Sequence, residues 1–147
     1  MLRHVLPLLL LAGVVAGGES LVPLRNLQVT DGLGMRWDMR PDGSVNDGTR
    51  VAFDGGQLLQ VNGQQFQCNQ PMATADGSEM VFAGTCSGLE VTRRVAVMQK
   101  EGACRWLEVL RNPGKAQATA TITVNSNLGS SAGPSLWSDG KPAAMGG

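Results

Sequence analysis

Apolar and polar residues alternate along short runs that follow one another from residue 27 onward. In the run 89–98 the odd positions are mostly leucine and valine, and in the run 117–125 the even positions are alanine, isoleucine and valine. A period of two places successive side chains on opposite faces of a β-strand. The pattern therefore predicts strands near residues 27–30, 35–39, 49–54, 57–61, 64–68, 79–85, 89–98, 103–111 and 117–125.

Turn-forming dipeptides separate these runs. Asp-Gly and Asn-Gly pairs supply the positive φ angles that tight hairpin turns need. Short strands at regular spacing, joined by such turns, are typical of antiparallel all-β domains. We expect an all-β fold, an antiparallel meander that forms a β-sandwich or an open barrel. The pairs stand at 31–32, 42–43, 47–48, 54–55, 62–63 and 76–77.

The first 18 residues differ from the rest. Arg3 precedes an apolar run at 5–16 that ends in small residues, as in a secretory signal peptide. The run is shorter than the ~20 residues that span a bilayer, and Pro7 weakens it as a helix. We expect cleavage after Ala16 or Gly18. The product is then secreted, periplasmic or at the cell surface, without stable membrane insertion.

The remaining chain divides into a body and a tail. Residues 19–128 hold all the predicted strands and are numerous enough for one domain with its own core. Residues 129–147 are rich in glycine, serine, proline and alanine, and they are predicted to form a tail or linker. The strand pattern stops short of the closing strands that a sandwich usually has. Whether the fold is incomplete at this end stays open.

Charge adds one exclusion. The chain has 12 Lys and Arg and 12 Asp and Glu, with no block of like charge. Proteins that bind DNA or RNA usually carry a basic patch or stripe. The balance therefore argues against nucleic acid as a partner.

Three cysteines, Cys68, Cys86 and Cys104, leave at least one thiol unpaired. A hairpin turn centred near Gly77 would place Cys68 opposite Cys86, and facing positions of antiparallel strands lie close enough for a disulfide. We expect a Cys68–Cys86 disulfide; the alternative is three reduced cysteines that pack as small apolar residues. Cys104, expected to face Met98, is predicted to be an unreactive buried thiol.

The sequence offers little catalytic chemistry. Its one histidine, His4, lies in the predicted leader, which argues against His-dependent nucleophiles and His-ligated metals in the mature protein. No P-loop, dinucleotide-binding or Cys-x-x-Cys spacing occurs. Paired carboxylates could hydrolyse a glycosidic bond, but the acidic residues scatter over turns and no pair stands out. We expect a protein that is not an enzyme and that needs no cofactor.

Two groups of residues are candidate ligand sites. Trp37, Trp106 and Trp137 would stack on sugar rings if exposed; Trp37 and Trp106 lie on predicted strands and suit the core, whereas Trp137 lies in the tail. Oxygen-bearing side chains crowd one glycine-containing loop and would suit calcium. However, Arg40 occupies a ligand position there, and aspartate is common in turns. The candidate metal ligands are Asp38, Asp42, Asn46 and Asp47.

Arg93 has the parity of the core-facing residues Val91 and Val95. A buried guanidinium without a partner is costly. We expect Glu108, one step from the position predicted to lie opposite Arg93, to form an ion pair with it. The alternative is that Arg93 and Arg94 together recognise an anion.

Three segments carry a distinctive sequence: TRRV at 92–95, LEVLRNP at 107–113 and SNLGS at 126–130. Together they resemble a β-rich module found in large secreted or surface proteins of bacteria. The resemblance implies an extracellular antiparallel β architecture that is often joined to other domains. It transfers no catalytic or binding residue to this chain.

These observations predict an exported, non-enzymatic module with a structural or interaction role outside the cytoplasm. Its expected partners are other extracellular domains or cell-surface polysaccharide. A carbohydrate-binding module that uses an exposed tryptophan is the alternative. A carboxylate-dependent hydrolase is a third hypothesis.

Overall fold

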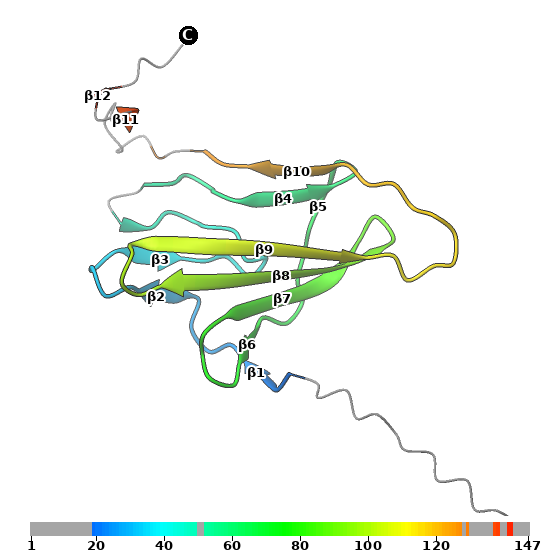
Figure 1. Cartoon of the computed structure of the whole chain (residues 1–147), viewed down its shortest axis with the longest axis horizontal. Helices are drawn as coiled ribbons and strands as arrows, with labels where there is room; N and C mark the ends of the chain where they lie inside the picture. Colours follow the sequence, from blue (N-terminus) through cyan, green and yellow to red (C-terminus); the bar gives the residue numbers. More distant parts are fainter. Residues whose placement is uncertain (1–18, 50–51, 128, 130–136, 139–140, 143–147) are drawn as a thin grey trace, which may run out of the picture.

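The computed structural model describes residues 19–49, 52–127, 129, 137–138 and 141–142, which form antiparallel β-sheets (Figure 1). Within these residues there is no α-helix, and the sheets do not close into a barrel. The described part of the chain also holds no helix long and apolar enough to cross a membrane. The all-β prediction is confirmed. The predicted signal peptide, residues 1–18, lies outside the described residues.

The larger sheet has five strands in the order β1-β6-β7-β8-β9, and every neighbouring pair is antiparallel. The hairpin of β8 and β9 pairs without interruption from Glu90 opposite Arg111 to Met98 opposite Ala103. β9 is one edge of this sheet and β1 is the other. The bounds are β1 Leu21–Pro23, β6 Met72–Thr74, β7 Met80–Cys86, β8 Leu89–Met98 and β9 Ala103–Arg111.

Three smaller sheets complete the described structure. One has the order β10-β4-β5, and the others are the pairs β2–β3 and β11–β12. The chain beyond β10 continues beside the segment that precedes β4, because Asn127 and Gly129 bond to the backbone of residues 52–55. The bounds are β2 Gln28–Thr30, β3 Arg36–Asp38, β4 Leu58–Val61, β5 Gln64–Gln65, β10 Ile122–Asn125, β11 Trp137–Ser138 and β12 Lys141–Pro142.

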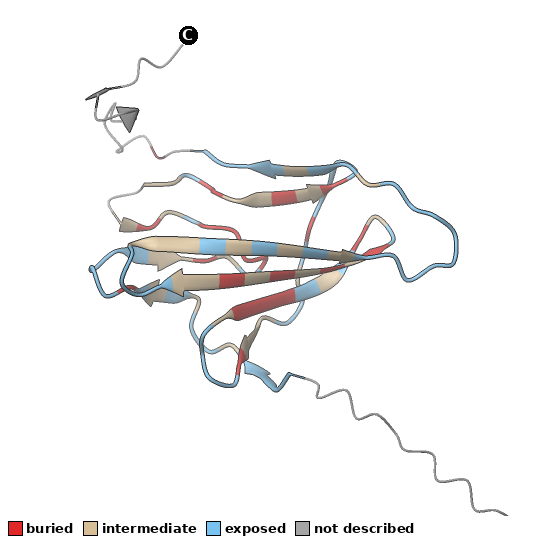
Figure 2. Cartoon of the chain, in the orientation of Figure 1, coloured by how far each residue is buried: buried red, intermediate tan, exposed pale blue. Residues whose placement is uncertain are grey.

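The core lies between the larger sheet and the β10-β4-β5 sheet. Alternate residues of β8 face it, and Figure 2 shows buried positions concentrated on β7, β8 and β4. Burying a large apolar side chain of this kind contributes about 1.5–3 kcal/mol. The core side chains that are less than 2% exposed include Phe82, Val91 and Val95 from the larger sheet, and Leu59, Val61 and Phe66 from the other side.

The loop between β3 and β4 covers part of the inner face of the larger sheet. Gly43 has a positive φ of 75° and lies so close to the sheet that an added Cβ would be 2.7 Å from both Phe82 and Arg93. Val45, fully buried, bridges to Met39 and Gly56. This stretch is therefore part of the core although it contains no regular strand.

The predicted strands agree best where the alternation is longest. The predictions for 89–98 and 103–111 match β8 and β9 residue for residue. The strand predicted at 49–54 does not form in the described part of that segment, and the one predicted at 117–125 is reduced to β10. Residues 117–121 alternate like a strand, but the Asn62 side chain accepts the Thr121 N–H, and no strand in the described part of the chain pairs with that stretch.

Two strands of the larger sheet were not predicted. β1 has three exposed residues, and β6 has three residues without alternation. Both are ordered by pairing, β1 with β6 and β6 with β7, rather than by an amphipathic pattern of their own. In the predicted tail, the pair β11–β12 was also not expected.

The predicted Arg93–Glu108 ion pair is confirmed, with a corrected register. Arg93 stands directly opposite Glu108 rather than one step away. The Arg93 Nε donates to Glu108 Oε1 at 2.8 Å, and Arg93 is fully buried. The Arg93 Nη2 atom lies 2.8 Å from the same oxygen but makes no hydrogen bond, and Glu108 Oε2 also has no partner. The Arg93 Nη1 donates to the carbonyl of Asp42 at 3.4 Å, which ties the covering loop to the sheet.

The expected Cys68–Cys86 disulfide is not present, because both cysteines are free thiols. The β6–β7 register pairs Met72 with Val81, so a continued ladder would carry position 68 to 85 instead of 86. β6 also begins only at Met72, and the Cys86 thiol donates to the Gln64 carbonyl at 3.3 Å. The register that predicted the bridge is therefore shifted by one residue, and the β6–β7 ladder does not extend back to Cys68.

Candidate binding cleft

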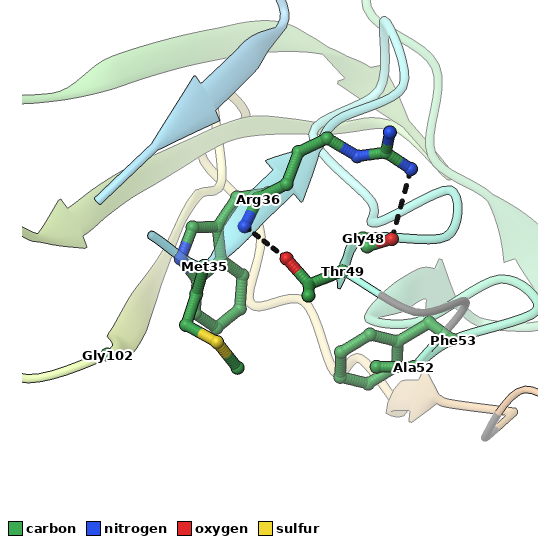
Figure 3. Close-up of a pocket in the computed structure, with 8 residues that line it drawn as sticks. Met35, Arg36, Gly48, Thr49, Ala52, Phe53 and Gly102 are labelled. Atoms are coloured by element: carbon green, nitrogen blue, oxygen red, sulfur yellow. Dashed lines mark hydrogen bonds between the residues drawn. The ribbon is translucent and has the colours of Figure 1, made fainter. Parts of the chain in front are cut away.

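A cleft of about 90 Å³ lies where the β2–β3 hairpin meets the loop before β4 and the turn between β8 and β9 (Figure 3). Most of its lining is apolar, and the parts come from three segments that are far apart in sequence. Met35, Arg36 and Trp37 come from β3 and the residue before it. The remaining lining residues are Gly48, Thr49, Ala52, Phe53 and Gly102.

Asp31 organises the hairpin that carries this cleft. Its Oδ1 accepts the backbone N–H groups of Leu33 and Met35, both at 2.9 Å, and its Oδ2 accepts the indole N–H of Trp37 at 3.2 Å. Burial raises the pKa of Asp31, but the hydrogen bonds from Met35, Trp37 and Leu33 outweigh it, so the pKa lies below its usual value. The ionised carboxylate therefore fixes both the loop and the Trp37 ring.

The same loop is tied to the β8–β9 turn. The Gly32 N–H donates to the Gln99 carbonyl at 2.8 Å, and an added Cβ at Gly32 would lie 2.5 Å from that carbonyl oxygen. A side chain larger than hydrogen would separate the two segments. Glycine at this position thus permits the close approach that brings Gly102 into the lining.

Arg36 closes another side of the cleft. Its backbone N–H donates to the Thr49 hydroxyl, and its Nη2 donates to the Gly48 carbonyl at 3.1 Å (Figure 3). The same Nη2 also donates to Asp47 Oδ1 at 2.9 Å. These bonds anchor residues 47–49 against β3. The guanidinium charge is balanced by Asp47 at a partly exposed site.

Apolar side chains continue from the cleft onto the surface. Leu33 is 64% exposed and Met35 is 43% exposed, and Met98 at the end of β8 is also exposed. The Leu33 side chain lies beside Gly102, where an added Cβ would be 3.3 Å from its Cδ1. Exposed apolar residues that border a concave site mark a surface suited to binding.

The two described tryptophan rings have different roles. Their centroids are 6.3 Å apart at an interplanar angle of 62°, an edge-to-face pair. The Trp106 indole N–H donates to the Gly43 carbonyl at 2.9 Å, which places that ring against the covering loop. Only Trp37 lines the cleft. The Trp137 side chain lies outside the described residues.

The four candidate calcium ligands make hydrogen bonds and ion pairs with neighbouring protein groups. Asp42 Oδ1 accepts the Ser44 N–H at 3.0 Å and its hydroxyl at 2.6 Å, a turn-forming arrangement. Asp47 is paired with Arg36, and Asp38 lies 3.4 Å from the Asn46 amide. Among the described residues, no group of three or more His, Cys, Asp or Glu side chains is placed to hold a metal ion.

Cys104 lies on the inner face of β9, opposite Val97 rather than the expected Met98. Burial raises the pKa of its thiol to about 12. At neutral pH the group is protonated and a weak nucleophile, since the thiolate is the reactive form.

Of the residues that line the cleft, only Trp37 was predicted from the sequence as a candidate ligand-binding residue. Asp31 and Gly32 were recognised as a turn signal, but the bond from Gly32 to Gln99 depends on where the hairpin packs against the rest of the chain. Phe53 was placed on a strand that does not form. Comparisons with protein-family models, with curated proteins and with solved structures gave no significant match.

Proposed function

We propose that this protein is an exported, non-enzymatic interaction module that binds another macromolecule through the cleft. The observation that carries the proposal is the preorganised apolar cleft bordered by exposed Leu33 and Met35. Sites for small organic ligands usually measure about 300–1,000 Å³. A volume of about 90 Å³ suits one apolar side chain of a protein partner better than a whole small molecule.

The proposed location outside the cytoplasm rests on the leader-like sequence of residues 1–18 and on the resemblance to secreted β modules. Glu19, the residue after one predicted cleavage point, contacts Arg94 through both carboxylate oxygens, at 2.6 and 2.7 Å. Cleavage after Gly18 would leave this contact in place. An intact mass of the product recovered outside producing cells tests the location. Retention of residues 1–18 in the cytoplasm contradicts it.

Photocrosslinking on producing cells tests the cleft. A photoreactive amino acid at position 33 is expected to give a discrete adduct with one partner, and one at exposed position 78 is expected to give none. Met35→Asp combined with the crosslinker at 33 is expected to abolish the adduct, since it places a charge in the apolar lining. No adduct at 33, or equal adducts at 33 and 78, would contradict binding through the cleft.

Carbohydrate binding is the second candidate, and the position of Trp37 in the cleft lining favours it. An aromatic face beside the polar Arg36 and Asp47 pair would suit a sugar ring with its hydroxyls. Retention on insoluble polysaccharides, lost in Trp37→Ala and kept in Leu107→Ala, would support it. An absence of retention on any cell-wall polysaccharide would leave the protein partner as the better account.

A further inference from the structure

A second surface, at the open side of the core, is distinct from the cleft. β9 pairs with β8 on one side, and in the described part of the chain no strand pairs with its other side. It is nine residues long and has no bulge in its ladder with β8. Proteins usually shorten, bend or cover such an edge, because its free backbone groups readily pair with another chain.

The inner face of β9 is less covered than that of β8. Val91, Arg93 and Val95 on β8 are at most 1% exposed. The residues opposite them on β9, in order, are only partly buried: Leu110, Glu108 and Trp106. The core-facing side chains of the larger sheet therefore become more exposed from β8 to its edge strand β9.

The facing sheet shows the same incomplete coverage at its own edge. Ile122 and Val124 of β10 lie directly opposite Val61 and Leu59, so they share the core-facing side. Val61 and Leu59 are buried, yet Ile122 is 42% and Val124 is 46% exposed. These two side chains point to the core side, and within the described residues no further strand pairs beside them to cover them.

The stacking of the two sheets explains where the missing cover would lie. β5 is bound to the end of β7, because Gln64 accepts hydrogen bonds from Cys86 and Ser87. With β5 beside β7, the strand order β5-β4-β10 of one sheet runs in the same direction across the core as the order β7-β8-β9 of the other. β10 therefore lies on the same side of the core as β9. In Figure 1, β9 is the strand of the larger sheet drawn nearest to β4 and β10. A strand added beside β9 would lie over Ile122 and Val124.

The charge of Glu108 favours a basic side chain at the middle of a strand added beside β9. Glu108 points to the inner face, and its Oε1 accepts the Arg93 hydrogen bond while its Oε2 has no partner. A basic side chain opposite Glu108 on the free side would supply that partner. β8 carries such a pattern on the other side of β9. Its residues Val91, Arg93 and Val95 lie opposite, in order, Leu110, Glu108 and Trp106.

We propose that the free edge of β9 accepts one extended antiparallel strand from a partner protein, with an apolar–x–basic–x–apolar pattern on its inner face. The basic residue pairs with Glu108, and the apolar residues cover Ile122 and Val124. Backbone pairing supplies the affinity and the alternate side chains supply the selectivity.

A labelled peptide with the β8 sequence LEVTRRVAVM, residues 89–98, is the probe, with fluorescence anisotropy as the readout. We expect saturable binding to the protein. Arg93→Glu in the peptide and Val124→Asp in the protein are each expected to weaken binding at least about tenfold. Val22→Asp, on β1 at the opposite edge of the larger sheet, is the matched exposed control and is expected to leave binding unchanged.

Hydrogen exchange on the unmodified protein provides a test that does not depend on a variant folding. The peptide is expected to slow exchange in residues 103–111 and to leave residues 31–37 unchanged. Absence of binding, equal binding by Val124→Asp, or protection confined to 31–37 would overturn the proposal. A dimer by light scattering in which β9 is already protected would also overturn it, because the occupant would then be a second copy.

Discussion

The β7–β8–β9 hairpins and the loop segment 31–57 build adjoining parts of the same core by different means. The hairpins depend on alternation, continuous pairing and buried apolar side chains. The loop segment depends on polar contacts, chiefly the bonds of Asp31, Arg36 and Asp42 to nearby backbone and side-chain groups. Regular strands thus supply the base of the molecule, whereas specific polar bonds shape the cleft upon it.

The two regions meet at Arg93, where the largest effect is expected. Arg93→Ala leaves Glu108 without its partner and is expected to lower the free energy of unfolding by about 3–5 kcal/mol, as for other broken buried pairs. Arg111→Ala is the control on the neighbouring strand, because its pair with Glu90 is largely exposed and such pairs usually contribute about 0–1 kcal/mol. Urea unfolding of both variants measures the difference. Equal losses would contradict a special role for the buried pair.

Contact between the loop and the sheet is tested next. Gly43→Ala forces a Cβ against Phe82 and Arg93 at a positive φ, so we expect a loss of about 2–3 kcal/mol in unfolding free energy. Gly77→Ala has a similar φ of 73° in open space and is expected to lose only about 1 kcal/mol. Thermal unfolding distinguishes the two. A larger loss for Gly77→Ala would show that conformation rather than contact dominates.

The accessibility of the half-buried Cys104 thiol then compares the native and unfolded states of β9. With a pKa of about 12, Cys104 is protonated at pH 8, so alkylation by iodoacetamide is expected to be slow in the native protein. In urea its rate should rise at least about tenfold as the pKa returns towards the ordinary value of about 8.5. Peptide mapping by mass spectrometry measures it. Rapid native labelling of Cys104 would contradict its burial.

Lowering the pH is expected to disturb the loop segment 31–57 before it disturbs the β7–β8–β9 hairpins. The expected effect on stability is smaller than those of the substitutions above. The pKa of Asp31 is lowered in the folded state, so its contribution is present above the ordinary value of about 3.9 and is lost as the pH falls through the folded pKa. We expect Trp37 fluorescence to change in this range while the far-ultraviolet circular dichroism of the sheets persists. Asp31→Asn should remove most of the pH dependence. If the fluorescence change with pH is the same in this variant, a group other than Asp31 causes it.

The smallest expected effect lies at the β6–β7 turn. Hydrogen bonds from Thr74 and Ser78 lower the pKa of Asp76 to about 2. Its contribution is therefore present above pH 4 and is lost as the pH falls towards 2. Asp76→Asn should reduce the acid sensitivity slightly without altering the cleft. Nuclear magnetic resonance titration of the carboxyl carbon gives the pKa directly.

Local patterning was enough to predict the parts of the fold in which neighbouring residues decide the outcome. The β8–β9 hairpin and the Arg93–Glu108 pair follow from alternation and a short turn. The Cys68–Cys86 bridge was wrongly predicted because the expected register is shifted by one residue and the β6–β7 pairing begins only at Met72. The cleft was missed because its walls come from segments that only the folded chain brings together.

The sequence by itself determined an all-β protein with antiparallel hairpins, since a period of two and glycine-containing turns act between near neighbours. Tertiary structure decided the rest: the side of β10 left uncovered, the approach of Gly32 to Gln99, and the position of Trp37 in the cleft. The physical reason is the distance along the sequence over which the deciding interactions act. Alternation selects the face of one strand, but the cover over that face comes from residues tens of positions away, whose placement depends on the packing of the whole domain.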